Sequence, residues 1–183
     1  MSEKNYYNFL SQLELPFLET HHDDLISIFT ILEDKFGLKP NSTQKLIDLG
    51  AGVGGIILFS GINYEIESFG IEINPTLIEE FLQKIEKLKN GDKISSELLK
   101  KIKMIHADLF EQNLEQYDYI YLYSLPTMHK YLRHVIKTAQ KGAIFISYKY
   151  PLKDFKRILK RRYQLKLEEN KQSIEVFFYE KIT

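Results

Sequence analysis

An apolar strand that ends in a run of glycines constrains this chain more than any other feature. The predicted strand is residues 46–49, and four of the next six residues are glycine. Glycines allow a tight turn and a close backbone approach to a ligand, and a following helix would present free N–H groups at its start. Glu72 stands at the tip of the next predicted strand, where its carboxylate would accept hydrogen bonds from ribose hydroxyls. The pattern therefore predicts a nucleoside cofactor at the carboxyl ends of two neighbouring strands.

The acidic residues around this turn indicate which kind of nucleoside cofactor it would bind. The glycines at positions 50, 52 and 55 also fit a dinucleotide pattern. However, Asp48 precedes them, and its carboxylate would repel a pyrophosphate but suit an ammonium or sulfonium charge. Asp108 follows a third apolar strand, where it could take an adenine amine or simply cap the next helix. A chain of 183 residues also leaves little room for the separate substrate domain that most nicotinamide dehydrogenases carry.

Together these features resemble the class I, S-adenosylmethionine-dependent methyltransferases. The resemblance covers residues 45–181 and implies S-adenosyl-L-methionine as the cofactor. It also implies a Rossmann-like sheet of seven strands, in which the last hairpin adds an antiparallel strand. The cofactor-binding residues expected on this basis are Asp48, Gly50, Ala51, Gly52, Gly54, Glu72, Ile73, Asp108 and Leu109.

Hydrophobic periodicity predicts strands that alternate with helices and then a terminal hairpin, which is a doubly wound, mostly parallel α/β sheet. We expect one domain, with an N-terminal helical segment at residues 1–44 and a cofactor-binding core at residues 45–183. The predicted strands are residues 46–49, 66–73, 102–106, 117–123, 143–148, 163–167 and 174–179. The predicted helices are residues 20–36 (capped by Thr20 with Asp23), 54–60, 75–90, 96–101, 132–139 and a short basic helix at 152–160.

Composition excludes several classes of function. The chain has no cysteine, which removes disulfides, thiolate zinc sites and cysteine nucleophiles. No apolar stretch is long enough to cross a membrane and the first residues do not resemble a signal peptide, so we expect a soluble, cytoplasmic protein, with a monomer favoured. Net charge is zero, but residues 149–166 hold eight bases against one acid. Such a segment could contact RNA or an acidic protein, or form a solvated helix face.

The methyl acceptor is expected beyond the fourth predicted strand, where methyltransferases of this class place it. Tyr123 and Ser124 stand there, and Tyr148 ends the fifth strand, so these three are the candidate catalytic residues. The two tyrosines could equally be packing residues of the sheet. The segment from Ser124 to Pro126 lacks the amide or carboxylate that holds a base amine, which argues against adenine methylation in DNA or RNA. Without cysteine, covalent attack on a pyrimidine is also excluded.

The remaining pattern resembles the small archaeal-type protein-lysine methyltransferases. The similar segments are residues 16–20, 119–123 and 175–180, although Glu19 replaces a second proline that is frequent there and Ala51 replaces a cysteine. This resemblance implies N-methylation of a protein lysine. An enzyme acting on RNA or a small molecule, and a cofactor-binding protein without turnover, stay open as alternatives.

The histidines do not indicate a catalytic site or a metal site. Residues 21–24, two histidines and two aspartates, are interpreted as a helix start rather than a metal cluster, since neighbours on a helix point in different directions. His129 and His134 fall on a predicted helix without an acidic partner and are expected at the surface. We therefore predict no metal site.

Overall fold

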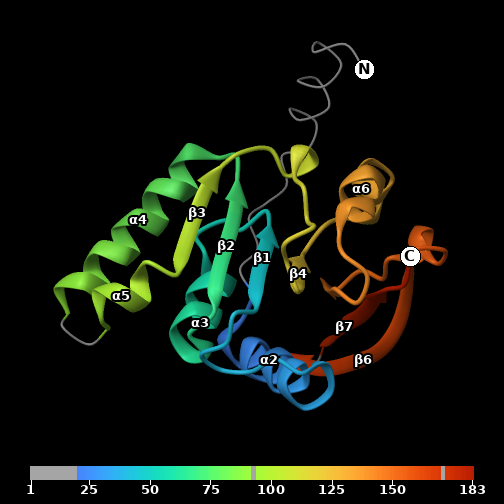
Figure 1. The fold of residues 1–183 in the computed structure, drawn as a ribbon, viewed down its shortest axis with the longest axis horizontal. Helices are drawn as coiled ribbons and strands as arrows, with labels where there is room; N and C mark the ends of the chain where they lie inside the picture. Colours follow the sequence, from blue (N-terminus) through green and yellow to red (C-terminus); the bar gives the residue numbers. More distant parts are fainter. Residues whose placement is uncertain (1–19, 92–93, 170–171) are drawn as a thin grey trace, which may run out of the picture.

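The computed structural model describes residues 20–91, 94–169 and 172–183. Its centre is a seven-stranded sheet with the order β3-β2-β1-β4-β5-β7-β6, shown in Figure 1. The first five strands are parallel, β7 pairs antiparallel with β5, and β6 pairs antiparallel with β7 at the sheet edge. The expected fold class is confirmed. The strands are β1 Lys45–Leu49, β2 Glu67–Glu72, β3 Ile102–His106, β4 Tyr119–Leu122, β5 Ile144–Tyr148, β6 Leu159–Glu169 and β7 Gln172–Lys181.

Side chains alternate between the two faces along each strand, and buried apolar side chains lie on both faces. Helices therefore cover both faces of the sheet. We call one face the α2 face, because the apolar side chains of α2, α3, α4 and α5 pack there. The other is the α6 face, covered by α6 and the short 3₁₀ helices η1 and η2. The helices are α2 His22–Phe36, α3 Gly55–Tyr64, α4 Pro75–Asn90, α5 Ser96–Leu99, α6 Pro126–Thr138, η1 Leu109–Glu111 and η2 Lys153–Phe155.

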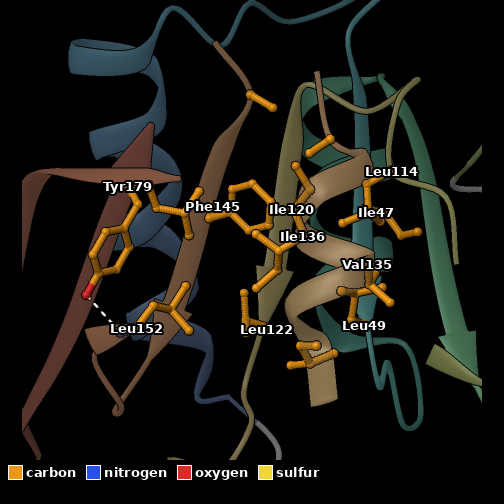
Figure 2. Close-up of a cluster of buried hydrophobic side chains, with 14 of the residues drawn as sticks. Ile47, Leu49, Leu114, Ile120, Leu122, Val135, Ile136, Phe145, Leu152 and Tyr179 are labelled. Atoms are coloured by element: carbon orange, nitrogen blue, oxygen red, sulfur yellow. Dashed lines mark hydrogen bonds between the residues drawn. The ribbon is translucent and has the colours of Figure 1, made fainter. Parts of the chain in front are cut away.

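Figure 2 shows how α6 packs on the sheet. Its Val135 and Ile136 lie against Ile47, Ile120 and other buried side chains of β1 and β4. Burying side chains of this size stabilises the fold by roughly 1.5–3 kcal/mol each. Alternation then sends the next side chains of the same strands, including Asp48, to the α2 face.

The segment after β5 differs from the expectation. Instead of a basic helix at residues 152–160, the chain forms only the short η2 and enters β6 at Leu159. Leu159 pairs with Lys181 of β7, so the backbone groups that a helix would satisfy internally are satisfied by the distant strand. The basic residues of this segment therefore lie partly on an edge strand.

The start of α2 also differs from the expectation. The N-cap residue is His21, which makes no side-chain capping bond, and the hydroxyl of Thr20 is instead hydrogen-bonded to Tyr121 at 2.8 Å. The helix ends as expected at Gly37, whose φ of 70° is the left-handed conformation that favours glycine. Residues 16–19 of the expected lysine-methyltransferase segment lie outside the described residues. Across the described ranges, no helix has the length and apolar composition that crossing a membrane requires.

Candidate functional site

The turn between β1 and α3 requires its glycines for different reasons. Gly50, Gly52 and Gly54 have φ values of 89°, 54° and 79°, a region where other residues are strained. Gly54 is also constrained by packing, because a Cβ there would lie 2.4 Å from a ring carbon of Phe81. The amides of Gly50 and Ala51 both donate to the carbonyl of Ile71, at 2.9 Å each. The turn is therefore held closely against β2.

Glu72 anchors this turn from the end of β2. Its Oε2 accepts a hydrogen bond from the amide of Gly52 at 2.8 Å, and its Oε1 accepts from the amides of Ile73 and Asn74 at 2.9 and 2.8 Å. The sequence pattern predicted a ribose ligand for this carboxylate but not its role in shaping the turn. Each carboxylate oxygen has about two acceptor positions, so Oε2 can accept one further donor. Ile73, the next residue in the chain, has an exposed side chain.

Asp48 lies on the α2 face beneath the turn and is only 4% exposed. Burial, and then the negative charge of Glu72, raise the pKa of Asp48 to about 8. A bound cation would reverse this effect by stabilising the carboxylate. Asp48 is therefore suited to a ligand that carries an ammonium or sulfonium group.

Asp108 and Leu109 approach the same turn from the end of β3. Asp108 Oδ1 accepts a hydrogen bond from the amide of Phe110 at 2.8 Å, so it caps η1, as one of the two sequence interpretations proposed. Leu109 lies 3.8 Å from the position that a Cβ on Gly50 would take. The structure thus brings the predicted cofactor residues of three strands to one end of the sheet.

The three candidate catalytic residues lie at the ends of β4 and β5. The rings of Tyr123 and Tyr148 meet edge to face with centroids 5.0 Å apart, and Tyr150 adds a third ring 6.2 Å from Tyr123. Ser124 is buried, and its hydroxyl is the one buried side-chain polar atom without a hydrogen-bond partner in the part of the chain that the structure describes. An unsatisfied buried hydroxyl costs free energy and points to a missing partner.

Tyr148 is more deeply placed than a residue lining an open channel. It is 1% exposed, and its hydroxyl donates to the carboxylate of Asp24 on α2. Together with the Thr20 to Tyr121 bond, this contact ties the start of α2 to the sheet. Burial raises the pKa of Tyr121 well above its usual value, so its hydroxyl stays neutral. Sequence reasoning missed Thr20, Asp24 and Tyr121, because their partners are about a hundred residues away.

The ammonium group of Lys149 lies over this aromatic cluster. Its Nζ is 5.3 Å from the ring centroid of Tyr123 and 5.6 Å from that of Tyr148, within the range of cation–π attraction. Lys149 takes a φ of 64°, which is uncommon for a residue with a side chain. The tyrosines at the ends of β4 and β5 therefore already accommodate a lysine ammonium.

His129 is buried, so the expectation that it lies at the surface is wrong. It is 1% exposed, and its Nε2 donates to the backbone carbonyl of Ser124 at 3.2 Å. Burial lowers the pKa of His129, which keeps the ring neutral near pH 7. The sequence pattern could not place it, because its partner is a backbone group. His134 is exposed, as expected. Within the described ranges, no three histidine, aspartate or glutamate side chains are arranged to hold a metal ion.

Comparisons with known proteins identify a sequence family and a shared fold. A sequence model described as the ANTKMT methyltransferase domain matches residues 48–158, more than half of the chain. An RNA methyltransferase from Salinibacter ruber, solved with S-adenosyl-L-homocysteine, has a TM-score of 0.73 at 17% identity, covering 90% of this chain and 94% of its own. No curated protein sequence matches the chain.

Two further solved structures show the same fold. TrmK from M. capricolum, in complex with S-adenosyl-homocysteine, has a TM-score of 0.62 at 14% identity and covers 89% of this chain and 70% of its own. TYW2 from P. horikoshii, in complex with MeSAdo, has a TM-score of 0.59 at 18% identity and covers 79% and 58%. At these identities the similarity shows the fold alone.

Proposed function

Because the chain belongs to the ANTKMT methyltransferase domain family and is an S-adenosylmethionine-dependent methyltransferase, we propose that it methylates a lysine amine on a protein. The family description favours this acceptor. The observation that carries the proposal is the aromatic cluster at the ends of β4 and β5, where the ammonium of Lys149 lies over the rings of Tyr123 and Tyr148. A second lysine side chain is the acceptor whose chemistry this environment fits best.

We assign the cofactor to the end of the sheet formed by β1, β2 and β3, within a core of residues 45–183. Glu72 would accept a hydrogen bond from a ribose hydroxyl at the free acceptor position of Oε2, and Asp48 would face the cationic methionine portion. Asp108 would use its second carboxylate oxygen for the adenine amine, between the apolar side chains of Ile73 and Leu109. When bound, the cofactor supplies a methyl group on a positively charged sulfur, which needs no acid to activate it.

At the acceptor end, the residues align a neutral amine. The unpartnered hydroxyl of Ser124 would accept a hydrogen bond from an N–H of the amine. The ring of Tyr123 would stabilise positive charge on the nitrogen. His129 positions Ser124 through its carbonyl. Alignment and exclusion of water would supply most of the rate enhancement, because the reaction is a direct displacement.

RNA is the second candidate acceptor. The Salinibacter ruber protein is described as an RNA methyltransferase, and the exposed bases Lys160 and Arg161 lie on the edge strand β6. Against this, the segment from Ser124 to Pro126 offers no amide or carboxylate for a base amine. The protein-lysine proposal is therefore favoured.

The test is the destination of a labelled methyl group. Purified protein is incubated with labelled S-adenosylmethionine and cell extract, and the product is treated with nuclease or protease and then hydrolysed. We expect the label to resist nuclease, to be released by protease and to be recovered as methyl-lysine. A Gly52→Val variant gives the background. Label in RNA or in a small molecule would reject the proposal.

Methyl transfer should also rise with pH. A lysine of ordinary pKa, about 10.4, is mostly protonated at pH 7, and an ammonium has no lone pair. Below that pKa the rate should increase roughly tenfold per pH unit until another step limits it. Single-turnover rates between about pH 7 and pH 9 measure this slope, and a flat profile would contradict attack by a free lysine amine.

A further inference from the structure

A groove away from the cofactor end lies on the α6 face of the terminal hairpin. It has a volume of about 550 Å³ and is bounded by η2 on one side and by β6 and β7 on the other. The apolar part of its lining includes the buried side chains of Leu152, Leu159 and Phe177. Glu175 in its lining lies beside the end of β5, since its carbonyl accepts a hydrogen bond from the amide of Lys149 at 2.9 Å. A chain lying in the groove would therefore continue toward the acceptor end of the sheet.

The groove is positively charged. Lys153, Lys156 and Arg161 line it, and all three are exposed. No carboxylate in the described ranges forms an ion pair with any of them. The single acid in the lining is Glu175, whose Oε1 accepts a hydrogen bond from Gln164 Nε2 at 2.5 Å. Three cations without ion-pair partners thus face one carboxylate that a neighbouring amide already engages.

We propose that this groove binds an acidic, extended segment of the protein substrate, a proposal that rests on protein-lysine methylation as the function. Lys153, Lys156 and Arg161 would pair with carboxylates of this segment. The groove does not suit single-stranded RNA, since its aromatic residues Phe177 and Tyr179 are only 3% and 6% exposed. They offer no open ring face on which a base could stack.

Binding of fluorescein-labelled decaglutamate, measured by fluorescence anisotropy on the full chain at low salt, tests the proposal. This peptide contains no lysine, so its binding is independent of the acceptor site and of whether lysine is the true acceptor. We expect saturable binding that weakens at high salt. Arg161→Glu should weaken it about tenfold, the loss expected for one charge-assisted contact. Lys156→Glu should act in the same direction.

Lys160→Glu is the matched control. Lys160 precedes Arg161 on the same strand, is also exposed and does not line the groove, so its substitution makes the same charge change elsewhere. It should change peptide affinity less than about twofold, and calorimetric S-adenosylmethionine affinity should be unaltered in all three variants. Absence of saturable peptide binding would overturn the proposal, as would equal weakening by Arg161→Glu and Lys160→Glu. Tighter binding of a uridine decamer that is lost in Arg161→Glu would also overturn it, in favour of nucleic acid.

Discussion

The carboxyl ends of β1, β2 and β3, where we propose the cofactor binds, and those of β4 and β5, where we propose the methyl acceptor binds, are built in different ways; we call them the cofactor end and the acceptor end. At the cofactor end, Glu72 holds Gly52, Ile73 and Asn74 through backbone amides, all within about one strand–helix–strand unit. At the acceptor end, the sheet tyrosines are held by α2, through Tyr148 to Asp24 and Tyr121 to Thr20. The first is made mostly of main chain and the second of side chains from distant elements. Substitutions should therefore affect the two ends separately.

Gly52→Val is expected to have the largest effect on the cofactor end. Gly52 has a φ of 54°, and a branched side chain would strain the turn and obstruct the ligand. Calorimetry should show S-adenosylmethionine affinity reduced by more than about a hundredfold. Gly142→Val is the control, because Gly142 has a φ of 91°, and a Cβ there would meet no atom within 4 Å. If Gly142→Val weakens cofactor binding as much, general destabilisation explains the loss.

Glu72→Ala should have the next largest effect. The change removes the carboxylate that three amides share and leaves those amides without their acceptor. Lost charge-assisted hydrogen bonds of roughly 1.5–3 kcal/mol correspond to about ten- to hundredfold weaker cofactor binding. Glu67→Ala, at the opposite end of β2 and bridged to Lys45 and Lys103, should leave affinity unchanged. Equal losses in both variants would refute a local role for Glu72.

Asp48→Asn should change how stability depends on pH. The pKa of Asp48 is about 8 in the fold and 3.8 as its ordinary value, so the native state keeps a proton that the unfolded chain releases. Stability is therefore lost as the pH rises through this window. Between pH 6 and pH 8 the wild type should lose about 2 kcal/mol more than Asp48→Asn, measured by urea unfolding.

The same variant should bind S-adenosylmethionine more weakly, because an amide does not attract the cationic ligand. Asp48→Asn would then be more stable at pH 8 and yet poorer in ligand binding. Parallel pH profiles for the two proteins would show that Asp48 is already ionised in the fold.

The smallest effect is expected at the acceptor end. Lys149→Gln removes the ammonium that lies over Tyr123 and Tyr148, so an incoming lysine would no longer compete with it. Loss of a cation–π contact of about 0.5–1 kcal/mol corresponds to a two- to fivefold lower KM for the protein acceptor. Cofactor affinity should not change. Lys141→Gln, at an exposed lysine away from the tyrosines, is the control, and an equal effect there would indicate a general charge effect.

Sequence reasoning succeeded where interactions are local. The turn from Asp48 to Gly54 and the place of Glu72 at the end of the next strand could be predicted from their spacing along the chain, whereas the hydrogen bond from Gly52 to Glu72 could not. The same reasoning placed a basic helix at residues 152–160, since nothing within that segment indicates that β7 will pair with Leu159. Pattern reading is weakest where a distant strand supplies the hydrogen bonds.

Polar contacts between distant parts of the chain could not be predicted from the sequence for the same reason. His129 was assigned to the surface because it lacks an acidic neighbour, yet its partner is the carbonyl of Ser124. Likewise, the helix start at Thr20 was interpreted as a cap, whereas its hydroxyl reaches Tyr121. A residue pattern reports neighbours along the chain and not the main-chain groups that folding brings close.

The three amides held by Glu72 have a consequence for the kinetics of ligand exchange. A glycine-rich segment loses more conformational entropy on ordering than any other kind of chain, and here that loss is incurred during folding. The turn then has little left to order when a ligand arrives, so association should be governed by diffusion and charge rather than by loop closure. The same rigid turn would release the spent cofactor without first unfolding, which favours rapid exchange between rounds of methylation.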